Sequence, residues 1–203
     1  MNDKSTNLTF RANIIIHGYA AAAYSAHTAI IPFSGPLIVD TIGLKTIKIA
    51  MTMSLENLFG RDFEEGALWS FGSVIDEMIS GPTIGIGTQS NILSLLPGVG
   101  SLPNSVFVIT LHEAIGWGLF LIFERGGNPT KMTKEELNVA FKEGAVRAQK
   151  GKEAYEKALN KLPLDARLEV EQLQEKIIAD KNISPTEKQA ISDSIIAIFE
   201  QYN

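Results

Sequence analysis

Hydrophobic positions along the chain follow helical spacing and stop repeatedly at glycine or proline. Four apolar segments occupy the first part of the chain, at residues 12–31, 37–59, 62–79 and 103–125. Glycine and proline directly after such segments favour helix ends. A strand would require a sustained alternation of apolar and polar side chains, and the sequence contains none. The pattern therefore predicts an all-α fold.

The last third of the chain has the pattern of amphipathic helices with clear starting signals. Thr133 precedes Glu136 by three residues, and Ser184 precedes Pro185 and Glu187. Both arrangements predict a capping box, in which a hydroxyl and a carboxylate each satisfy a free backbone N–H. Three apolar stripes follow helical spacing: Leu137, Phe141, Ala145, Ala148, Tyr155 and Leu159; Ala166, Val170, Leu173 and Ile177; Ile191, Ile195, Phe199 and Tyr202.

Charged side chains are distributed unevenly between the two halves. Residues 12–123 carry 11 of them in 112 positions, whereas residues 124–203 carry 27 in 80. The Gly-Gly-Asn-Pro stretch at 126–129 disfavours a continuous helix and marks the boundary. We therefore expect an apolar helical domain at 1–128 and a charged, amphipathic helical region at 129–203 that packs on it.

The composition excludes several functional classes. The 203 residues include no Cys, which rules out disulfide frameworks, thiolate zinc sites and cysteine nucleophiles. The net charge is −5 without a basic tract, which excludes nucleic acid as a class of partner. Phosphate-binding, dinucleotide-binding and serine-nucleophile motifs are also missing. The sequence predicts no cofactor and no catalytic residue.

Five polar residues within the apolar segments are candidates for burial: Asp40, Lys45, Lys48, His112 and Glu113. An unpaired buried charge costs several kcal/mol, so a carboxyl in an apolar stretch must find a partner or take up a proton. We expect Lys45 or Lys48 to pair with Glu113. Without a partner, Glu113 would be a proton- or ion-handling site. A metal-dependent enzyme built on His112 and Glu113 is a minor alternative, because the spacings of zinc proteases and di-iron bundles are absent.

The segment 105–123 is the best candidate for a membrane span, and it is marginal. Its 19 residues include 11 Val, Ile, Leu or Phe. These contribute about −5 kcal/mol on the insertion scale, and the central Glu113 costs about +3 kcal/mol. Segments 13–31 and 37–55 hold more polar side chains and fail as independent spans. The sequence leaves one further alternative, a helical hairpin that enters a bilayer only after the chain has assembled.

Two Gly/Pro-rich turns occur in a recognisable order. Ile-Pro-Phe-Ser-Gly-Pro at 31–36 follows an Ala-rich helix, and Leu-Leu-Pro-Gly-Val-Gly-Ser at 95–101 precedes an apolar helix. Over residues 18–150 this order resembles the uncharacterised, YcjF-like helical domain family that accompanies bacterial GTPases. The resemblance implies a GTPase on a separate chain and an association with membranes, and it implies no catalytic residue. The turn or interface residues that it marks are Pro32, Gly35, Pro36, Pro97, Gly98 and Gly100.

Together these observations predict a non-enzymatic helical interaction module that self-associates and docks on a GTPase or a membrane surface. The charge-poor helices exceed what a polar tail of 75 residues easily covers, and exposed apolar patches mark interfaces. The small residues of segment 12–31 would let a second helix approach closely. The alternative is a membrane-inserted channel or pore-like oligomer. The expected location is intracellular, in the cytoplasm or at the inner membrane.

Overall fold

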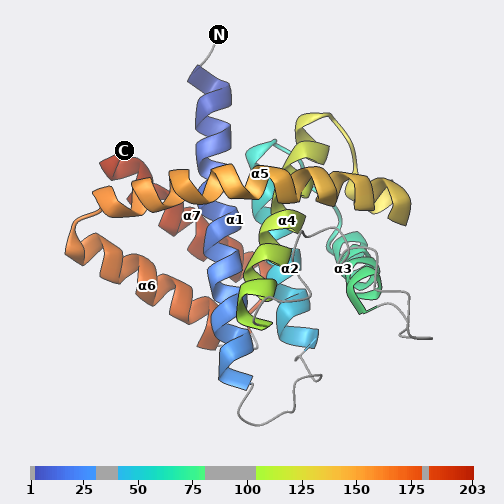
Figure 1. The fold of residues 1–203 in the computed structure, drawn as a ribbon, viewed down its shortest axis with the longest axis horizontal. Helices are drawn as coiled ribbons and strands as arrows, with labels where there is room; N and C mark the ends of the chain where they lie inside the picture. The colour runs from blue at the N-terminus through green and yellow to red at the C-terminus, as the bar shows by residue number, and fades with distance from the viewer. Residues whose placement is uncertain (1–2, 31–40, 81–103, 180–182) are drawn as a thin grey trace.

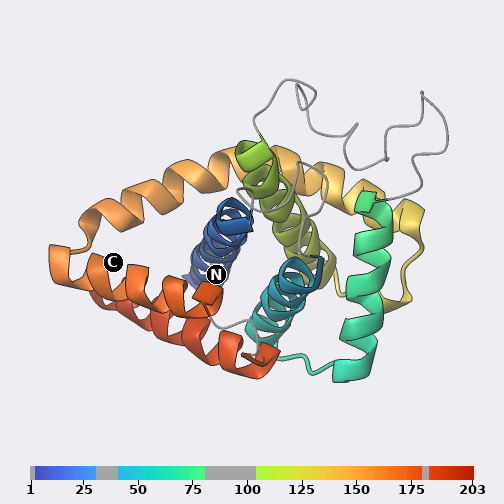
Figure 2. The ribbon, with the colours of Figure 1, turned by 90° about the horizontal axis from the view of Figure 1, so that it is seen from below.

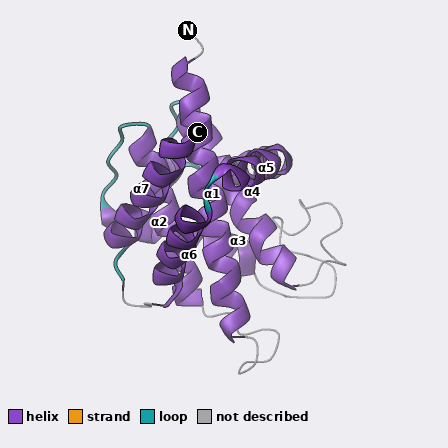
Figure 3. Ribbon diagram, turned by 90° about the vertical axis from the view of Figure 1, so that its left-hand side faces the viewer, coloured by secondary structure: helices purple, strands orange, loops and turns teal. Residues whose placement is uncertain are grey.

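The computed structural model describes residues 3–30, 41–80, 104–179 and 183–203. Over these ranges it contains seven α-helices and no strand, so the predicted all-α fold is confirmed. Figure 3 colours the described residues as helix or loop only. The helices are α1 (Asp3–Ile30), α2 (Thr41–Leu58), α3 (Glu65–Ser80), α4 (Asn104–Glu124), α5 (Lys134–Lys161), α6 (Leu164–Ala179) and α7 (Pro185–Tyr202). A short 3-10 helix, η3 (Pro129–Lys131), precedes α5.

Three helices of the apolar half lie in the centre, and the other four surround them. Figure 1 shows α5 lying across α1 and α4. Helix α4 packs on both α1 and α5. Seen from below in Figure 2, α6 and α7 lie on one side of the central helices and α3 lies on the other. Helix α6 packs on α1, whereas α7 and α3 both pack on α2. The central helices therefore bury their apolar side chains against the chain's own charged helices.

This arrangement corrects two expectations. The small residues Ala12, Ala20, Ala22 and Ala23 are buried in the core, so this part of α1 offers no surface to a second molecule. Nor do the described charge-poor helices exceed what the polar half covers. A helix of 28 residues such as α5 is roughly 42 Å long at about 1.5 Å per residue, which is long enough to cross several helices at once.

Helices α4 and α5 cross with their backbones in contact, and two glycines make the crossing possible. A Cβ atom at Gly118 would lie 2.6 Å from the Phe141 ring and 2.9 Å from the carbonyl oxygen of Ala140. A Cβ atom at Gly144 would overlap the backbone of Ala114 and Gly118. Because interiors are packed like crystals, any side chain at these positions would push the helices apart. The crossing brings the inner face of α5 over the middle of α4.

Local signals fix several helix ends. The predicted capping boxes at Thr133 and Ser184 are both confirmed, since each hydroxyl accepts from the backbone N–H three residues later and the glutamate accepts in return. At the end of α4, Gly126 has φ +80°, and the Gly127 N–H donates to the carbonyl of Ile122 at 2.8 Å. This is the Schellman ending that a left-handed glycine permits.

In the described part of the chain, no helix combines the length and the hydropathy that a bilayer crossing requires. That result includes α4, which contains the candidate span 105–123.

Candidate functional site: a buried polar cluster

The most distinctive polar feature of the interior is a pair between α1 and α4. His17 Nδ1 lies 2.8 Å from Glu113 Oε1, and both side chains are buried. The expected pairing of Glu113 with Lys45 or Lys48 is therefore wrong. The physical reason is the helix order in space: α4 lies beside α1 along much of its length, and the two lysines of α2 turn toward α3 instead.

The aromatic ring of Tyr155 completes this pair from the side of α5. It stacks on the His17 imidazole with ring centroids 5.2 Å apart and an interplanar angle of 26°. The Tyr155 hydroxyl accepts from Gln174 Nε2 of α6 at 3.4 Å. Burial raises the pKa of Tyr155, so the phenol stays protonated. One residue each from α1, α4 and α5 thus forms a polar layer inside the bundle.

A second layer lies one helical turn away along the same three helices. Asn13 precedes His17 by four residues, Trp117 follows Glu113 by four, and Gly151 precedes Tyr155 by four. Residues four apart lie on one face of a helix, so the two layers are stacked. The contacts show this directly, because a Cβ atom at Gly151 would lie 2.8 Å from both Asn13 Oδ1 and Trp117 Nε1. We call these six residues the polar cluster.

Three atoms of the polar cluster lack a hydrogen-bond partner among the described residues: Asn13 Oδ1, His17 Nε2 and Trp117 Nε1. All three residues are buried. Unpaired polar atoms at such depth are rare in folded proteins, because each costs about 1–3 kcal/mol in lost hydration. Three of them within two helical turns set this region apart from the remaining core.

A cation covers the outer side of Trp117. The guanidinium carbon of Arg147 lies 4.9 Å from the centre of the Trp117 ring and 4.8 Å from that of Phe120. Arg147 also pairs with Glu124, with 3.6 Å between Nη1 and Oε2. Arg147 therefore holds the tryptophan ring in place from the side of α5.

The two lysines of α2 form a separate polar link with α3. Lys48 is buried and pairs with Asp76, and burial lowers the pKa of the Lys48 ammonium group. Lys45 donates to Ser73 Oγ at 2.5 Å and lies over the Trp69 ring at 5.3 Å. These contacts hold α3 against α2, and they lie away from Glu113.

Glu56 is a second buried carboxyl, near the end of α2. Its Oε1 accepts from the Phe63 backbone N–H at 3.4 Å, and Oε2 has no partner within the described ranges. Burial, with a smaller contribution from the negative charge of Asp62, raises the pKa of Glu56 to about 7. Glu56 therefore takes up a proton at a higher pH than an exposed glutamate does.

Of the remaining predicted site residues, His112 lies within the described part of the chain and the others lie outside it. His112 is buried, and its Nδ1 lies 2.8 Å from the carbonyl oxygen of Val108 within α4. Among the described side chains, no group of three or more His, Asp or Glu is arranged to hold a metal ion. The other predicted positions lie outside the described residues: Asp40, Pro32, Gly35, Pro36, Pro97, Gly98 and Gly100.

A surface hollow lies between α3, η3 and the start of α5. Its volume is about 230 Å³, and its lining consists of Ala67, Ser70, Phe71, Val74, Pro129, Thr130, Met132 and Leu137. The lining contains two hydroxyls and no ionisable group, so it offers no acid, base or ion ligand.

Comparison of the chain with known protein families, with curated proteins and with solved structures found no match. The resemblance to the helical family that accompanies bacterial GTPases, and the GTPase partner that it implies, therefore stay predictions.

Proposed function

We propose that the chain is a non-enzymatic helical interaction module whose partner is a second copy of itself. The observation that carries the proposal is a set of four large aliphatic side chains on the outer faces of α5 and α6. They are Val139 and Val146, exposed by 56% and 71%, and Leu164 and Leu168, exposed by 74% and 48%. The buried polar cluster, in contrast, is enclosed by helices and offers no open site for a substrate.

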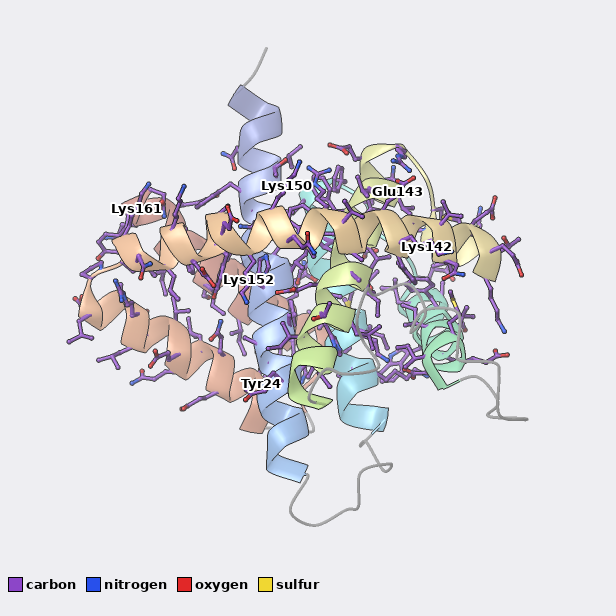
Figure 4. All side chains as sticks on the ribbon, in the orientation of Figure 1. Tyr24, Lys142, Glu143, Lys150, Lys152 and Lys161 are labelled. Carbon is purple, nitrogen blue, oxygen red and sulfur yellow. The ribbon has the colours of Figure 1, made fainter. Side chains whose placement is uncertain are left out.

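On α5 the two valines alternate with lysines along one stripe. Val139, Lys142, Val146 and Lys150 follow helical spacing and are all exposed. Figure 4 labels both lysines, on the helix that lies in front of α1 and α4. Glu143 lies beside them and pairs with Arg125 at 2.5 Å. This pairing partly neutralises the negative charge of Glu143 next to the stripe. The α5 stripe is therefore apolar and basic.

On α6 the exposed stripe has the opposite charge. Leu164 and Leu168 are followed on the same face by Glu171 and Glu175, and all four are exposed. The α6 stripe is therefore apolar and acidic. The α5 stripe of one molecule complements the α6 stripe of another in charge, and each stripe adds two exposed aliphatic side chains to the contact.

If α5 of each molecule contacts α6 of the other at once, the contact is a twofold dimer, because residue i contacts residue j and j contacts i. If only one of the two contacts forms, the assembly continues as a chain or a ring. The GTPase of the resemblance would be a further, separate partner and is not needed for this contact.

The test is light scattering coupled to size-exclusion chromatography over a wide concentration range. The expected result is a mass that rises with concentration. The variants Lys142→Glu/Lys150→Glu and Glu171→Lys/Glu175→Lys should each weaken association about tenfold, since two stripes of like charge then face each other. The quadruple variant combines both reversals and should restore association.

Lys152→Glu is the matched control, because Lys152 is exposed on α5 but lies outside the stripe. A monomer at every concentration would overturn the proposal. So would self-association that ignores both charge reversals.

A further inference from the structure

The surface hollow between α3, η3 and the start of α5 has an apolar inner wall. Phe71, Pro129 and Leu137 are the buried members of its lining. The hollow has a volume of about 230 Å³. Because an apolar cavity of about 150 Å³ is enough to bind benzene, the hollow has room for one aromatic ring with a small substituent.

Two hydroxyls belong to the described lining, and both already use their protons. Ser70 Oγ donates to the carbonyl oxygen of Gly66 at 3.0 Å. Thr130 Oγ1 donates to Asn128 Oδ1 at 2.8 Å. Since a hydroxyl has one proton and two lone pairs, each of these oxygens can offer a ligand only an acceptor. The hollow therefore favours a molecule that brings its own hydrogen-bond donor.

The charges near the hollow favour a neutral molecule. No residue in the described lining is ionisable. Glu77 and Lys134, each three residues from a lining residue, pair with each other at 2.5 Å. Their opposite charges thus offset each other beside the hollow. Because an unpaired charge is costly to bury in apolar surroundings, a charged ligand is disfavoured.

Both sides of the hollow are held in place by contacts within the chain. Asn128 Oδ1 also accepts from the Thr130 backbone N–H at 3.0 Å, which fixes η3. The capping box at Thr133 fixes the start of α5 directly after it. Helix α3, on the other side, is held to α2 by the two lysines of that helix (Figure 2). A site formed in advance costs little ordering when a ligand binds.

We propose that this hollow binds a small, monocyclic phenol. The ring packs on the apolar lining, where the Phe71 ring and the Met132 thioether are favourable neighbours for an aromatic ring. The phenol O–H donates to Ser70 Oγ or to Thr130 Oγ1. With a pKa of about 10, a phenol is neutral at pH 7. The hollow shares no residue with the α5 and α6 stripes, so this inference is independent of the proposed self-association.

The direct test is a titration of the unmodified chain with p-cresol at pH 7, followed by two-dimensional amide NMR. The expected result is a saturable shift that is largest for residues 67–74 and 129–137. The matched ligand is 4-methylanisole, which has the same ring but no proton on its oxygen, and it should bind about fivefold more weakly. Equal binding of the two ligands, or no saturable shift with p-cresol, would overturn the proposal.

A third ligand separates a free phenol from a tyrosine side chain of another protein. N-acetyltyrosinamide carries the same phenol between two peptide groups, for which the described lining has no dedicated partner. It should bind more weakly than p-cresol. Binding at least as tight as that of p-cresol would overturn the proposal in favour of a protein partner.

Substitutions show whether the hollow is the site. Ala67→Leu fills the hollow with a larger side chain and should abolish saturable binding of p-cresol. Gly66→Ala is the matched control on the neighbouring residue, because its Cβ would meet no atom within 4 Å, and binding should be unchanged. Thermal unfolding checks that both variants are folded. If folded Ala67→Leu binds p-cresol as the unmodified chain does, the proposal is wrong.

The double variant Ser70→Ala/Thr130→Val tests the hydrogen bond separately from the apolar contact. It should weaken p-cresol binding about fivefold, to the level of 4-methylanisole. The binding of 4-methylanisole itself should stay the same. An equal loss for both ligands would contradict the proposed role of the two hydroxyls.

Discussion

His17 and Glu113 form a buried pair across 96 positions of sequence, with 2.8 Å between Nδ1 and Oε1. The ring of Tyr155 on α5 also stacks against the imidazole of His17. The pair therefore ties three helices together at one point. Buried polar pairs of this kind are costly to break from one side only, since the remaining partner is left without a hydrogen bond.

The first prediction concerns the cost of removing only one partner of this pair. Glu113→Leu leaves His17 without its acceptor and should lower the free energy of unfolding by about 1–3 kcal/mol. Glu113→Gln keeps an acceptor oxygen and should cost less. The double variant His17→Leu/Glu113→Leu should lose less than the sum of the two single variants, as measured by urea unfolding at pH 7. Additive losses would show that the two side chains do not interact.

The second prediction concerns the crossing of α4 and α5. Gly144→Ala places a methyl group into the backbone of α4 and should destabilise the chain by about 3 kcal/mol, near the upper end for overpacked cores. Gly66→Ala is the matched control, because its Cβ would meet no atom within 4 Å. That change should stabilise α3 by about 0.5–1 kcal/mol through helix propensity. Thermal unfolding of both variants measures the difference, and equal effects would contradict a tight crossing.

Helix boundaries followed from the sequence because their causes are local. The Thr133 and Ser184 capping boxes and the helix stop at Gly60 depend on a few neighbouring residues, and the structure has all three. The start of α1 at Asp3 was missed, since the polar residues before Ala12 continue the helix without adding to the apolar pattern. The sequence therefore predicts a helix end where a local signal marks it, and misses a helix start for which only the apolar pattern was used.

The partners of buried groups did not follow from the sequence, because they depend on which helices lie side by side. Charge alone favoured a lysine for Glu113, but α1 brings His17 to it and α3 brings Asp76 to Lys48. The spacing of four between Asn13 and His17, between Glu113 and Trp117, and between Gly151 and Tyr155 was visible in the sequence. Only the packing of the three helices shows that these pairs meet.

The third prediction concerns the pair between Lys48 and Asp76. Lys48 is buried, whereas Asp76 is half-buried and can be hydrated if its partner is removed. Lys48→Met should therefore be nearly neutral or stabilise by about 1 kcal/mol, because it replaces a buried ammonium group with an apolar chain of similar length. Asp76→Asn leaves the ammonium group without a carboxylate and should cost about 1–3 kcal/mol. Denaturant unfolding at pH 7 compares the two, and a larger loss in Lys48→Met would contradict this explanation.

The fourth prediction concerns pH and Glu56. The pKa of this carboxyl is raised from 4.5 to about 7 in the folded state, mainly by burial. Between these two values the folded chain holds a proton that the unfolded chain has released. The stabilising contribution is therefore complete below pH 4.5, and it is lost as the pH rises through 7.

Glu56→Gln removes this dependence, because a carboxamide stays neutral at every pH. The variant should match the unmodified chain near pH 4.5 and exceed its free energy of unfolding by about 3 kcal/mol at pH 8, since the pKa difference between 4.5 and about 7 corresponds to about 1.4 kcal/mol per pKa unit. Glu64→Gln is the control, because Glu64 is exposed and the same chemical change should leave the pH profile parallel to that of the unmodified chain. Urea unfolding at intervals of half a pH unit measures all three profiles. A constant difference between Glu56→Gln and the unmodified chain would show that Glu56 keeps its charge in the folded state, and burial would then be compensated by a partner at Oε2.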